Sequence, residues 1–272
     1  MSSIQQLYPA NRPVPFPGAY LAHDLRQQSN GAKPYVYANF VASLDGRIAI
    51  PHPSGDGLTV PNNVANERDW RLFQELAAQA DLIISSGRYL RDWAAGRAQE
   101  ILQVDDPRFA DLRAWRQKQG LPPQPDIAIL SSSMRFPVPA ALTAGGRRFV
   151  VVTSGSPDPD RVSEVEAVGG QVISAGTTAV DGGQMIAALG RLGYQLIYSA
   201  AGPRILHLLA ASNVLNRLYL THASRLLGGS PFASIVDGPL FDSAVDMRLN
   251  TLYWDGEGVD GLGQLFVSYD RA

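Results

Sequence analysis

The sequence predicts an α/β fold with a mostly parallel central sheet, flanking helices and antiparallel strands at the C-terminal edge. Up to about residue 212, short apolar segments alternate with amphipathic ones, which is the pattern of a parallel sheet with helices on both faces. Beyond that point, strand-like segments follow one another directly, as in antiparallel pairs. With 272 residues, 45% of them hydrophobic and 18% charged, the chain can bury a substantial core.

The first 33 residues are predicted to be irregular. Pro9, Pro13, Pro15 and Pro17 lie close together, and such a density of prolines excludes a regular helix or a central strand. We interpret residues 1–33 as a proline-rich N-terminal extension that lies on the domain, reaches a partner subunit or forms a disordered tail. Residues 34–272 show no repeat and no linker, so they are expected to form one domain.

The remaining elements are predicted from hydrophobic periodicity and from the residues that start or end helices and strands. Apolar runs predict strands at 35–41, 81–85, 127–130, 148–153, 171–174 and 196–198, and then at 217–221, 247–254 and 265–269. Amphipathic segments predict helices at 63–78, 88–93, 107–119, 181–192 and 203–211. Residues 51–63, with three prolines and two glycines, are predicted to be a loop.

Composition excludes several functional classes. The chain has no cysteine and only four scattered histidines, so we expect no metal site. The net charge of −2 gives no basic surface for nucleic acid. Because no apolar run approaches ~18 residues and no signal pattern opens the sequence, we expect no membrane segment and a cytoplasmic location.

Small hydroxyl residues and glycines follow five of the predicted parallel strands. In open parallel sheets, ligands bind at the carboxyl ends of the strands. Small residues let backbone N–H groups approach a phosphate, and arginine adds a charged fork. Each motif alone is more often an ordinary turn, and their combination carries the prediction. The residues are Ser43, Asp45 and Gly46; Ser86, Gly87 and Arg88; Ser131 and Ser132; Thr153 and Ser154; and Gly202, Pro203 and Arg204.

Three common fingerprints are missing. The sequence contains no Gly-x-Gly-x2-Gly, no Gly-x4-Gly-Lys-Ser/Thr and no Gly-x-Ser-x-Gly. A standard Rossmann dinucleotide site, a P-loop and a nucleophile elbow are therefore disfavoured.

Four segments in order resemble the bacterial riboflavin-biosynthesis reductase domain, which has the dihydrofolate-reductase-like fold. The most specific is Ser43-Leu44-Asp45-Gly46-Arg47-Ile48-Ala49. The others are residues 80–88, the Gly202-Pro203-Arg204-Ile205-Leu206 segment, and residues 218–220 leading to Leu226-Leu227-Gly228-Gly229. The resemblance extends over about residues 34–269.

The resemblance implies an NADPH-dependent reductase that transfers hydride to a pyrimidine, pterin-like or ribosylamino-pyrimidine substrate, related to 5-amino-6-(5-phosphoribosylamino)uracil reductase. It places the nicotinamide near Ala42–Asp45 and Gly202. It also implies a small-molecule substrate and a homodimer with the late strands at the interface. The phosphates would lie near Ser86, Gly87, Arg88 and Tyr89 and near Ala201, Gly202, Pro203, Arg204 and Ile205, and the adenosine half near Ser131, Ser132, Thr153 and Ser154.

The sequence departs from the family pattern at two positions. Ala200 stands where the family usually has a glutamate, which leaves the substrate open. Leu90 stands where it tends to have a threonine, which leaves the phosphate contacts open. The choice between NADPH and NADH also stays open, because several arginines could bind a 2′-phosphate.

Asp45 is the candidate catalytic residue, because it is the only carboxylate in the key strand-end segment. It would polarise or protonate the substrate, unless it only caps its own turn. Ser43 would orient the substrate or the carboxamide. Trp70 and Arg71 are further candidates to face the substrate, and His52 to cover it, although core packing and a solvated loop are the ordinary roles of Trp70 and His52.

Two other functions fit the sequence. A paralogue that binds a dinucleotide or flavin without turnover would explain Ala200. A sugar-phosphate transferase, or another α/β enzyme that uses no nicotinamide, would explain the phosphate-type strand ends.

Overall fold

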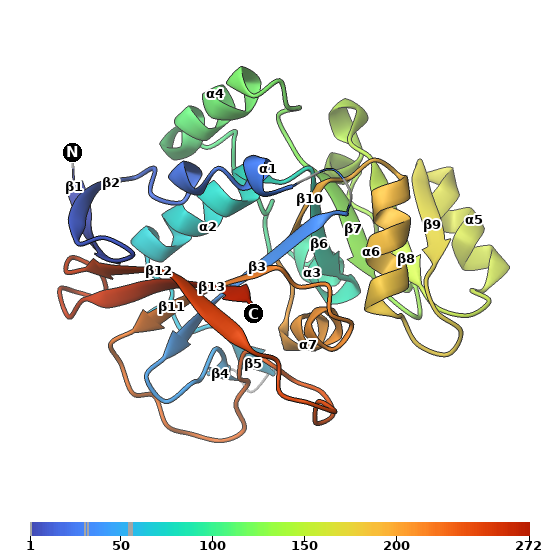
Figure 1. The fold of residues 1–272 in the computed structure, drawn as a ribbon. Helices are drawn as coiled ribbons and strands as arrows, with labels where there is room; N and C mark the ends of the chain where they lie inside the picture. Colours follow the sequence, from blue (N-terminus) through green and yellow to red (C-terminus); the bar gives the residue numbers. More distant parts are fainter. Residues whose placement is uncertain (1, 30, 32, 54–56) are drawn as a thin grey trace.

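The computed structural model describes residues 2–29, 31, 33–53 and 57–272. An eleven-stranded sheet crosses the molecule in the order β2-β1-β12-β13-β11-β3-β10-β6-β7-β8-β9 (Figure 1). Its strands are β1 Ser2–Tyr8, β2 Arg12–Phe16, β3 Tyr35–Ser43, β6 Leu82–Ser86, β7 Asp126–Leu130, β8 Phe149–Thr153, β9 Gly170–Ser174, β10 Leu196–Ser199, β11 Arg217–Ala223, β12 Met247–Asp255 and β13 Gln264–Arg271. The α-helices are α1 Leu25–Gln28, α2 Glu67–Gln79, α3 Gly87–Ala94, α4 Ala110–Lys118, α5 Pro159–Ala167, α6 Gly182–Arg191 and α7 Pro203–Ala211.

The half of the sheet from β11 to β9 is parallel, as predicted. Its strands pair in register, with Tyr198 of β10 opposite both Tyr37 of β3 and Ile83 of β6. Except in the edge strand β9, their apolar runs are buried on both faces, which is why they show no alternation in the sequence. One face packs against α2 and α4, and the other against α6 and α7.

The other half of the sheet is antiparallel. Strand β13 pairs with both β11 and β12, so the predicted late strands form one antiparallel unit. The outer edge is not formed by these C-terminal strands, because β1 pairs with β12 and β2 lies outside β1.

The prediction that residues 1–33 are irregular was wrong. The segment forms the hairpin β1–β2, a short 3-10 helix η1 (Leu21–His23) and α1. The prolines limit only the place of the strand: Pro13 and Pro15 lie on β2, which is the edge of the sheet, where a missing N–H breaks no ladder. Residues 30 and 32 of the extension lie outside the described part, as does residue 1.

Other differences concern boundaries and small elements. Helix α2 begins at Glu67 rather than at residue 63, because the Asn66 side chain accepts hydrogen bonds from the N–H groups of Arg68 and Asp69. The predicted loop at 51–63 contains the short pair β4 (Ile50–Pro51) and β5 (Leu58–Thr59), while residues 54–56 lie outside the described part. Four 3-10 turns are described, η1 and then η2 Pro107–Phe109, η3 Ala140–Leu142 and η4 Ala144–Gly146.

Candidate functional site

The parallel strands end together at one edge of the sheet, next to a topological switch point. The chain runs from β3 to β6 and outward to β9, and then returns to insert β10 between β3 and β6. From there it continues to β11 on the far side of β3. The connections that leave β6 and β10 therefore diverge, and at such a switch point α/β proteins bind ligands in the crevice outside the strand ends.

Two helices start at this crevice without a side-chain cap. Helix α3 follows β6 directly, and α7 follows β10, and neither Ser86 nor Gly202 caps its helix. By contrast, Asn66, Asp158 and Asp181 cap α2, α5 and α6. The first N–H groups of α3 and α7 are thus available to an anion, and both helix dipoles favour one.

Close packing at Gly87 joins two of the predicted strand ends. A Cβ atom at Gly87 would lie 3.1 Å from the Phe136 ring and 3.2 Å from Ser131 Oγ. The Ser131 hydroxyl also accepts the N–H of Met134 at 3.1 Å. At Gly202 an added Cβ would meet nothing within 4 Å, so the start of α7 is open. The open start of α7 leaves its first backbone N–H groups accessible to an anion.

Arg88 and Arg204 lie at the starts of the same two helices and are loosely held. The Arg88 side chain is 65% exposed and contacts Asp92 and the Leu58 carbonyl only at 3.4 Å. Arg204 is 87% exposed and pairs with Asp237 at 2.9 Å. Both guanidinium groups can reorient toward a phosphate at little cost, because exposed ion pairs are weak.

Several predicted cofactor residues do not face the crevice as expected. Tyr89 donates its hydroxyl to the Gln99 carbonyl and packs its ring near Trp93. Thr153 is fully buried, so its side chain cannot reach a ligand at the strand ends. Ala42 and Ile205 are buried as well, and can contribute only packing and backbone. Of the remaining predicted residues, Pro203 begins α7, Ala201 is half-buried, Ser132 is exposed, and the Ser154 hydroxyl contacts the Thr178 carbonyl.

Ser43 and Asp45 form a clamp between the end of β3 and the loop after β11. Ser43 Oγ donates to Asp45 Oδ1 at 2.5 Å, and the N–H of Gly228 donates to Oδ2 at 2.8 Å. Arg47 pairs with the same carboxylate at 2.7 Å. The hydrogen bond from Ser43, followed by that from Gly228, lowers the pKa of Asp45 to about 2. A carboxylate this acidic is ionised near neutral pH, so Asp45 fits the polarising half of its predicted role better than the proton-donating half.

Asp69, in the first turn of α2, has the opposite environment. It is 7% exposed and faces the sheet, where the hydroxyl of Thr221 on β11 is its neighbour. Burial raises the pKa of Asp69 to about 6, and the Thr221 hydroxyl lowers it only in part. Within the described residues, no arginine, lysine or histidine forms an ion pair with Asp69. A buried carboxylate without a cation is costly, and such groups concentrate at functional sites.

Half-exposed rings and an amide lie on the same face of the sheet. Trp70 stacks on Phe73 at 4.7 Å, and Phe73 meets the edge of Tyr198 at 5.7 Å. The Tyr198 hydroxyl donates to Asn39 of β3. Ala200 packs against the same apolar cluster as Trp70 and Phe73. Asp69 is thus a carboxyl group beside aromatic walls near the carboxyl ends of β3, β10 and β11.

Sequence reasoning missed Asp69 and overvalued Arg71. Asp69 lies in an amphipathic helix between residues predicted as core, and no local motif marks it. Arg71 is buried, and it is held by Glu75 and Asp111 at 2.9 Å each, so it does not face a substrate. His52 lies in the exposed loop before residues 54–56, and its backbone N–H donates to the Gly57 carbonyl.

Comparison with known proteins gives one matching family model and two sequence relatives. The model of the RibD C-terminal domain matches residues 34–260. A protein of Archaeoglobus fulgidus named 2,5-diamino-6-ribosylamino-4(3H)-pyrimidinone 5′-phosphate reductase is 27% identical over 214 residues, which cover 77% of this chain and 89% of the relative. A protein of the same name from Methanothermobacter thermautotrophicus is 24% identical, over 83% of this chain and 95% of the relative.

Solved structures show the same fold. A pyrimidine reductase-like protein from Corynebacterium diphtheriae superposes with a TM-score of 0.65 at 20% identity, covering 90% of this chain and 98% of that one. RibD from Acinetobacter baumannii has a TM-score of 0.58 at 16% identity, covering 91% of this chain and 60% of that one. The predicted fold class is confirmed. No helix in the described residues is both long and apolar enough to cross a membrane.

Proposed function

The chain belongs to the RibD C-terminal domain family, and on that premise we propose that it is an NADPH-dependent reductase of a 2-aminopyrimidine or pterin-like substrate. The observation that carries the choice of ring is the buried carboxyl of Asp69 beside the Thr221 hydroxyl. The two relatives are named for a substrate whose ring carries a 2-amino group, a 4-oxo group and a hydrogen on N3.

Asp69 matches one edge of such a ring. The N3–H and the 2-amino group are adjacent donors, and a carboxylate offers two acceptor oxygens at a similar spacing. Trp70 and Phe73 stack on each other, so together they can cover one face of the ring. Because Ala200 provides no carboxylate on this face of the sheet, we infer that Asp69 supplies the acidic group of the pocket.

The cofactor is proposed to lie across the ends of β3, β10, β6 and β7. Its phosphates would meet the uncapped starts of α3 and α7, with Arg88 and Arg204 beside them. When bound, NADPH supplies a hydride for a C=N or C=C bond of the substrate. The clamp between Asp45, Ser43 and Gly228 holds the turn after β3 and the loop after β11 together at this end of the sheet.

A turnover assay tests the proposal. Purified protein is titrated with NADPH and NADH and then given a panel of 2-aminopyrimidines, their ribosylamino 5′-phosphates, pterins and flavins, with NADPH oxidation followed by absorbance. Oxidation with a 2-amino-4-oxo ring, and none with the corresponding ring that lacks the 2-amino group, supports it. Tight NADPH binding without turnover of any compound would instead favour the non-catalytic binding protein. Failure of both nucleotides to bind at millimolar concentration would contradict a nicotinamide enzyme altogether.

Removing Arg88 should weaken cofactor binding. Arg88→Ala is expected to raise the Kd for NADPH about 10- to 100-fold, the loss of ~1.5–3 kcal/mol from a charge-assisted hydrogen bond. Isothermal titration calorimetry measures the change, and Arg191→Ala, an exposed arginine on α6, is the matched control. Equal affinities in the two variants would remove Arg88 from the phosphate site.

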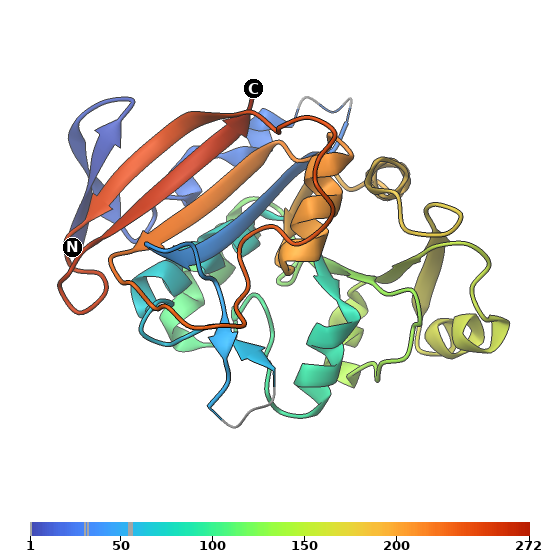
Figure 2. The ribbon, with the colours of Figure 1, turned by 90° about the horizontal axis from the view of Figure 1, so that it is seen from below.

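We also propose that the protein is a homodimer formed through the late strands. Side chains of β12 and β13 that point away from α2 form an apolar surface, and Figure 2 shows these strands with no helix in front of them. Trp254 on this surface is 39% exposed, and Leu252 and Leu265 are half-buried. Light scattering should give twice the chain mass for the native protein and the chain mass for Trp254→Asp. A native monomer would contradict the proposal.

A further inference from the structure

The N-terminal segment, residues 2–29, packs on the same face of the sheet as α2, the helix that carries Asp69. It lies outside the range that the family model matches, yet Phe16, Tyr20 and Leu25 are buried in the same core cluster as α2. Figure 1 shows it passing beside α2 at the antiparallel end of the sheet. The segment is therefore in a position to contribute to a site that lies between α2 and the sheet.

Tyr20 is fixed in this segment by its own backbone. Its N–H donates to Glu75 Oε2 at 2.9 Å, and its carbonyl accepts from Gln79 Nε2 at 2.9 Å. The ring is 2% exposed and packs 4.7 Å from the ring of Tyr219, the residue two positions before Thr221 on β11. Both anchors belong to α2, so the orientation of Tyr20 is tied to the helix that carries Asp69.

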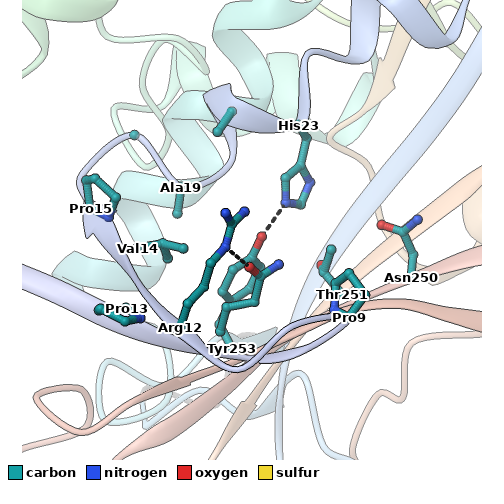
Figure 3. A pocket seen from close by; sticks show the side chains of 13 residues that line it. Pro9, Arg12, Pro13, Val14, Pro15, Ala19, His23, Asn250, Thr251 and Tyr253 are labelled. Carbon is teal, nitrogen blue, oxygen red and sulfur yellow. Dashed lines mark hydrogen bonds between the residues drawn. The ribbon is translucent and has the colours of Figure 1, made fainter.

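The hydroxyl of Tyr20 is buried and has no hydrogen-bond partner among the described residues. Leaving a buried hydroxyl unpaired is unfavourable, so a partner such as an ordered water is expected. His23 cannot serve, because its Nδ1 and Nε2 are each 2.8 Å from the hydroxyls of Tyr219 and Tyr253. Figure 3 shows the contact with Tyr253 at a cavity of about 470 Å³ that Arg12 also lines.

Among the acidic groups near Tyr20, Asp69 has the largest effect on the pKa of the Tyr20 hydroxyl. After burial and Tyr219, Asp69 contributes most to raising the pKa of Tyr20, ahead of Tyr253 and Glu75. Asp69 also raises the pKa of Tyr198 on β10. The hydroxyl of Tyr198 is committed to Asn39, whereas the hydroxyl of Tyr20 has no partner among the described residues. Tyr219 and Thr221 project from the same face of β11, so Tyr20, which packs on Tyr219, and Asp69, which lies beside Thr221, are neighbours on that face.

We propose that Tyr20 is a positioning residue of the substrate site, and that its hydroxyl donates to the Asp69 carboxylate through a shared water. Its relevance to catalysis rests on the proposed function, because Asp69 is assigned there to the substrate ring. The N-terminal segment then completes a site that the residues 34–260 would leave with one donor fewer. Losing this donor disfavours the ionised form of Asp69, so the pKa of its carboxyl rises and ring binding weakens.

The test is a titration of the ligand-free protein in which the aspartate carboxyl carbons are labelled with ¹³C and observed by NMR. In Tyr20→Phe, the titration of Asp69 is expected to move upward by roughly one pH unit, the effect of one hydrogen bond to a charged group. Tyr253→Phe, which changes a hydroxyl bonded to His23, should leave the Asp69 titration in place. The Asp69 signal is assigned with Asp69→Asn.

Two results would overturn the proposal. One is an Asp69 titration that is the same in Tyr20→Phe and in the native protein. The other, which does not depend on the folding of any variant, is a high-resolution crystal structure of the native protein with no water between Tyr20 and Asp69. Neither measurement involves turnover. A failure of the proposed function, seen as no NADPH oxidation with any ring, is therefore distinguishable from the absence of a hydrogen bond between Tyr20 and Asp69 through water.

Discussion

Asp69→Asn is expected to lower kcat/KM for the aminopyrimidine substrate by about 10²- to 10³-fold. A carboxylate accepts from both N–H donors of the ring edge, whereas an amide accepts one and turns its own NH₂ against the other. A buried mismatch of this kind costs several kcal/mol, and each ~1.4 kcal/mol is tenfold in rate. Steady-state NADPH oxidation measures the effect, while the Kd for NADPH should change little because the proposed phosphate site is at α3 and α7, away from Asp69.

The same substitution should raise the stability of the fold. Burial raises the pKa of Asp69 from 3.8 to about 6, so the ionised group destabilises the folded state. This cost is fully present above pH 6 and disappears as the pH falls toward 3.8, where Asp69 is protonated in both the folded and the unfolded chain. Urea unfolding at pH 7.5 should show Asp69→Asn to be more stable by ~1–3 kcal/mol. At pH 4 the difference should vanish.

The pH profile distinguishes recognition by the carboxylate from proton donation. If ionised Asp69 binds the ring, kcat/KM rises between pH 5 and pH 7, because the carboxyl loses its proton near pH 6. Asp69→Asn should lack this limb, and Asp242→Asn, which changes an exposed carboxylate, should retain it. A profile that instead falls above pH 6 would show Asp69 to be a proton donor and would contradict its assignment as an acceptor.

Local chemistry explains what could be predicted. Strands and helices could be predicted because hydrophobic periodicity is visible in consecutive residues. The position of the crevice could be predicted because parallel strands end at a common edge of the sheet. Gly87 and Gly202 could be singled out because small residues after a strand let backbone N–H groups approach a phosphate. In the structure, Gly87 packs close to Ser131, and the start of α7 at Gly202 is open. In each case, the residues on which the prediction depends lie within a few positions of a strand end.

The polar centre of the site could not be predicted in the same way. Asp45 stood out because it lies in a recognisable turn, but its carboxylate is satisfied by Ser43, by the loop after β11 and by Arg47. Asp69 has no motif, and its chemistry comes from the face of α2 that meets Thr221, a residue distant in sequence. The high proline content likewise prevented prediction of the N-terminal hairpin. Proline is excluded from a central strand, but an edge strand tolerates it.

The second large effect is expected at Glu75, which joins the N-terminal segment to α2. Its buried carboxylate accepts from the N–H groups of Gly18 at 2.6 Å and Tyr20 at 2.9 Å, and from Arg71 Nε at 2.9 Å. Glu75→Leu leaves the N–H groups of Gly18 and Tyr20 without this acceptor and removes one of the two carboxylates that pair with the buried Arg71. Breaking a buried charge network in this way destabilises by about 3–5 kcal/mol. Urea unfolding measures the loss, with Glu164→Leu on the exposed side of α5 as the matched control.

Glu75→Gln removes the negative charge of the side chain but keeps its shape, so it tests the two contributions separately. The amide keeps one acceptor oxygen for the segment, so the loss of unfolding free energy should be smaller than for leucine, and Arg71 keeps its contact with Asp111. Because Glu75 lies about 1.7 helical turns beyond Asp69, a loosened segment is also expected to shift the part of α2 that carries the proposed substrate contact. We therefore expect KM for the substrate to rise in Glu75→Gln while the Kd for NADPH stays constant. If Glu75→Leu unfolds at the same urea concentration as Glu164→Leu, the extension is not part of the folding unit and its contacts do not set the position of α2.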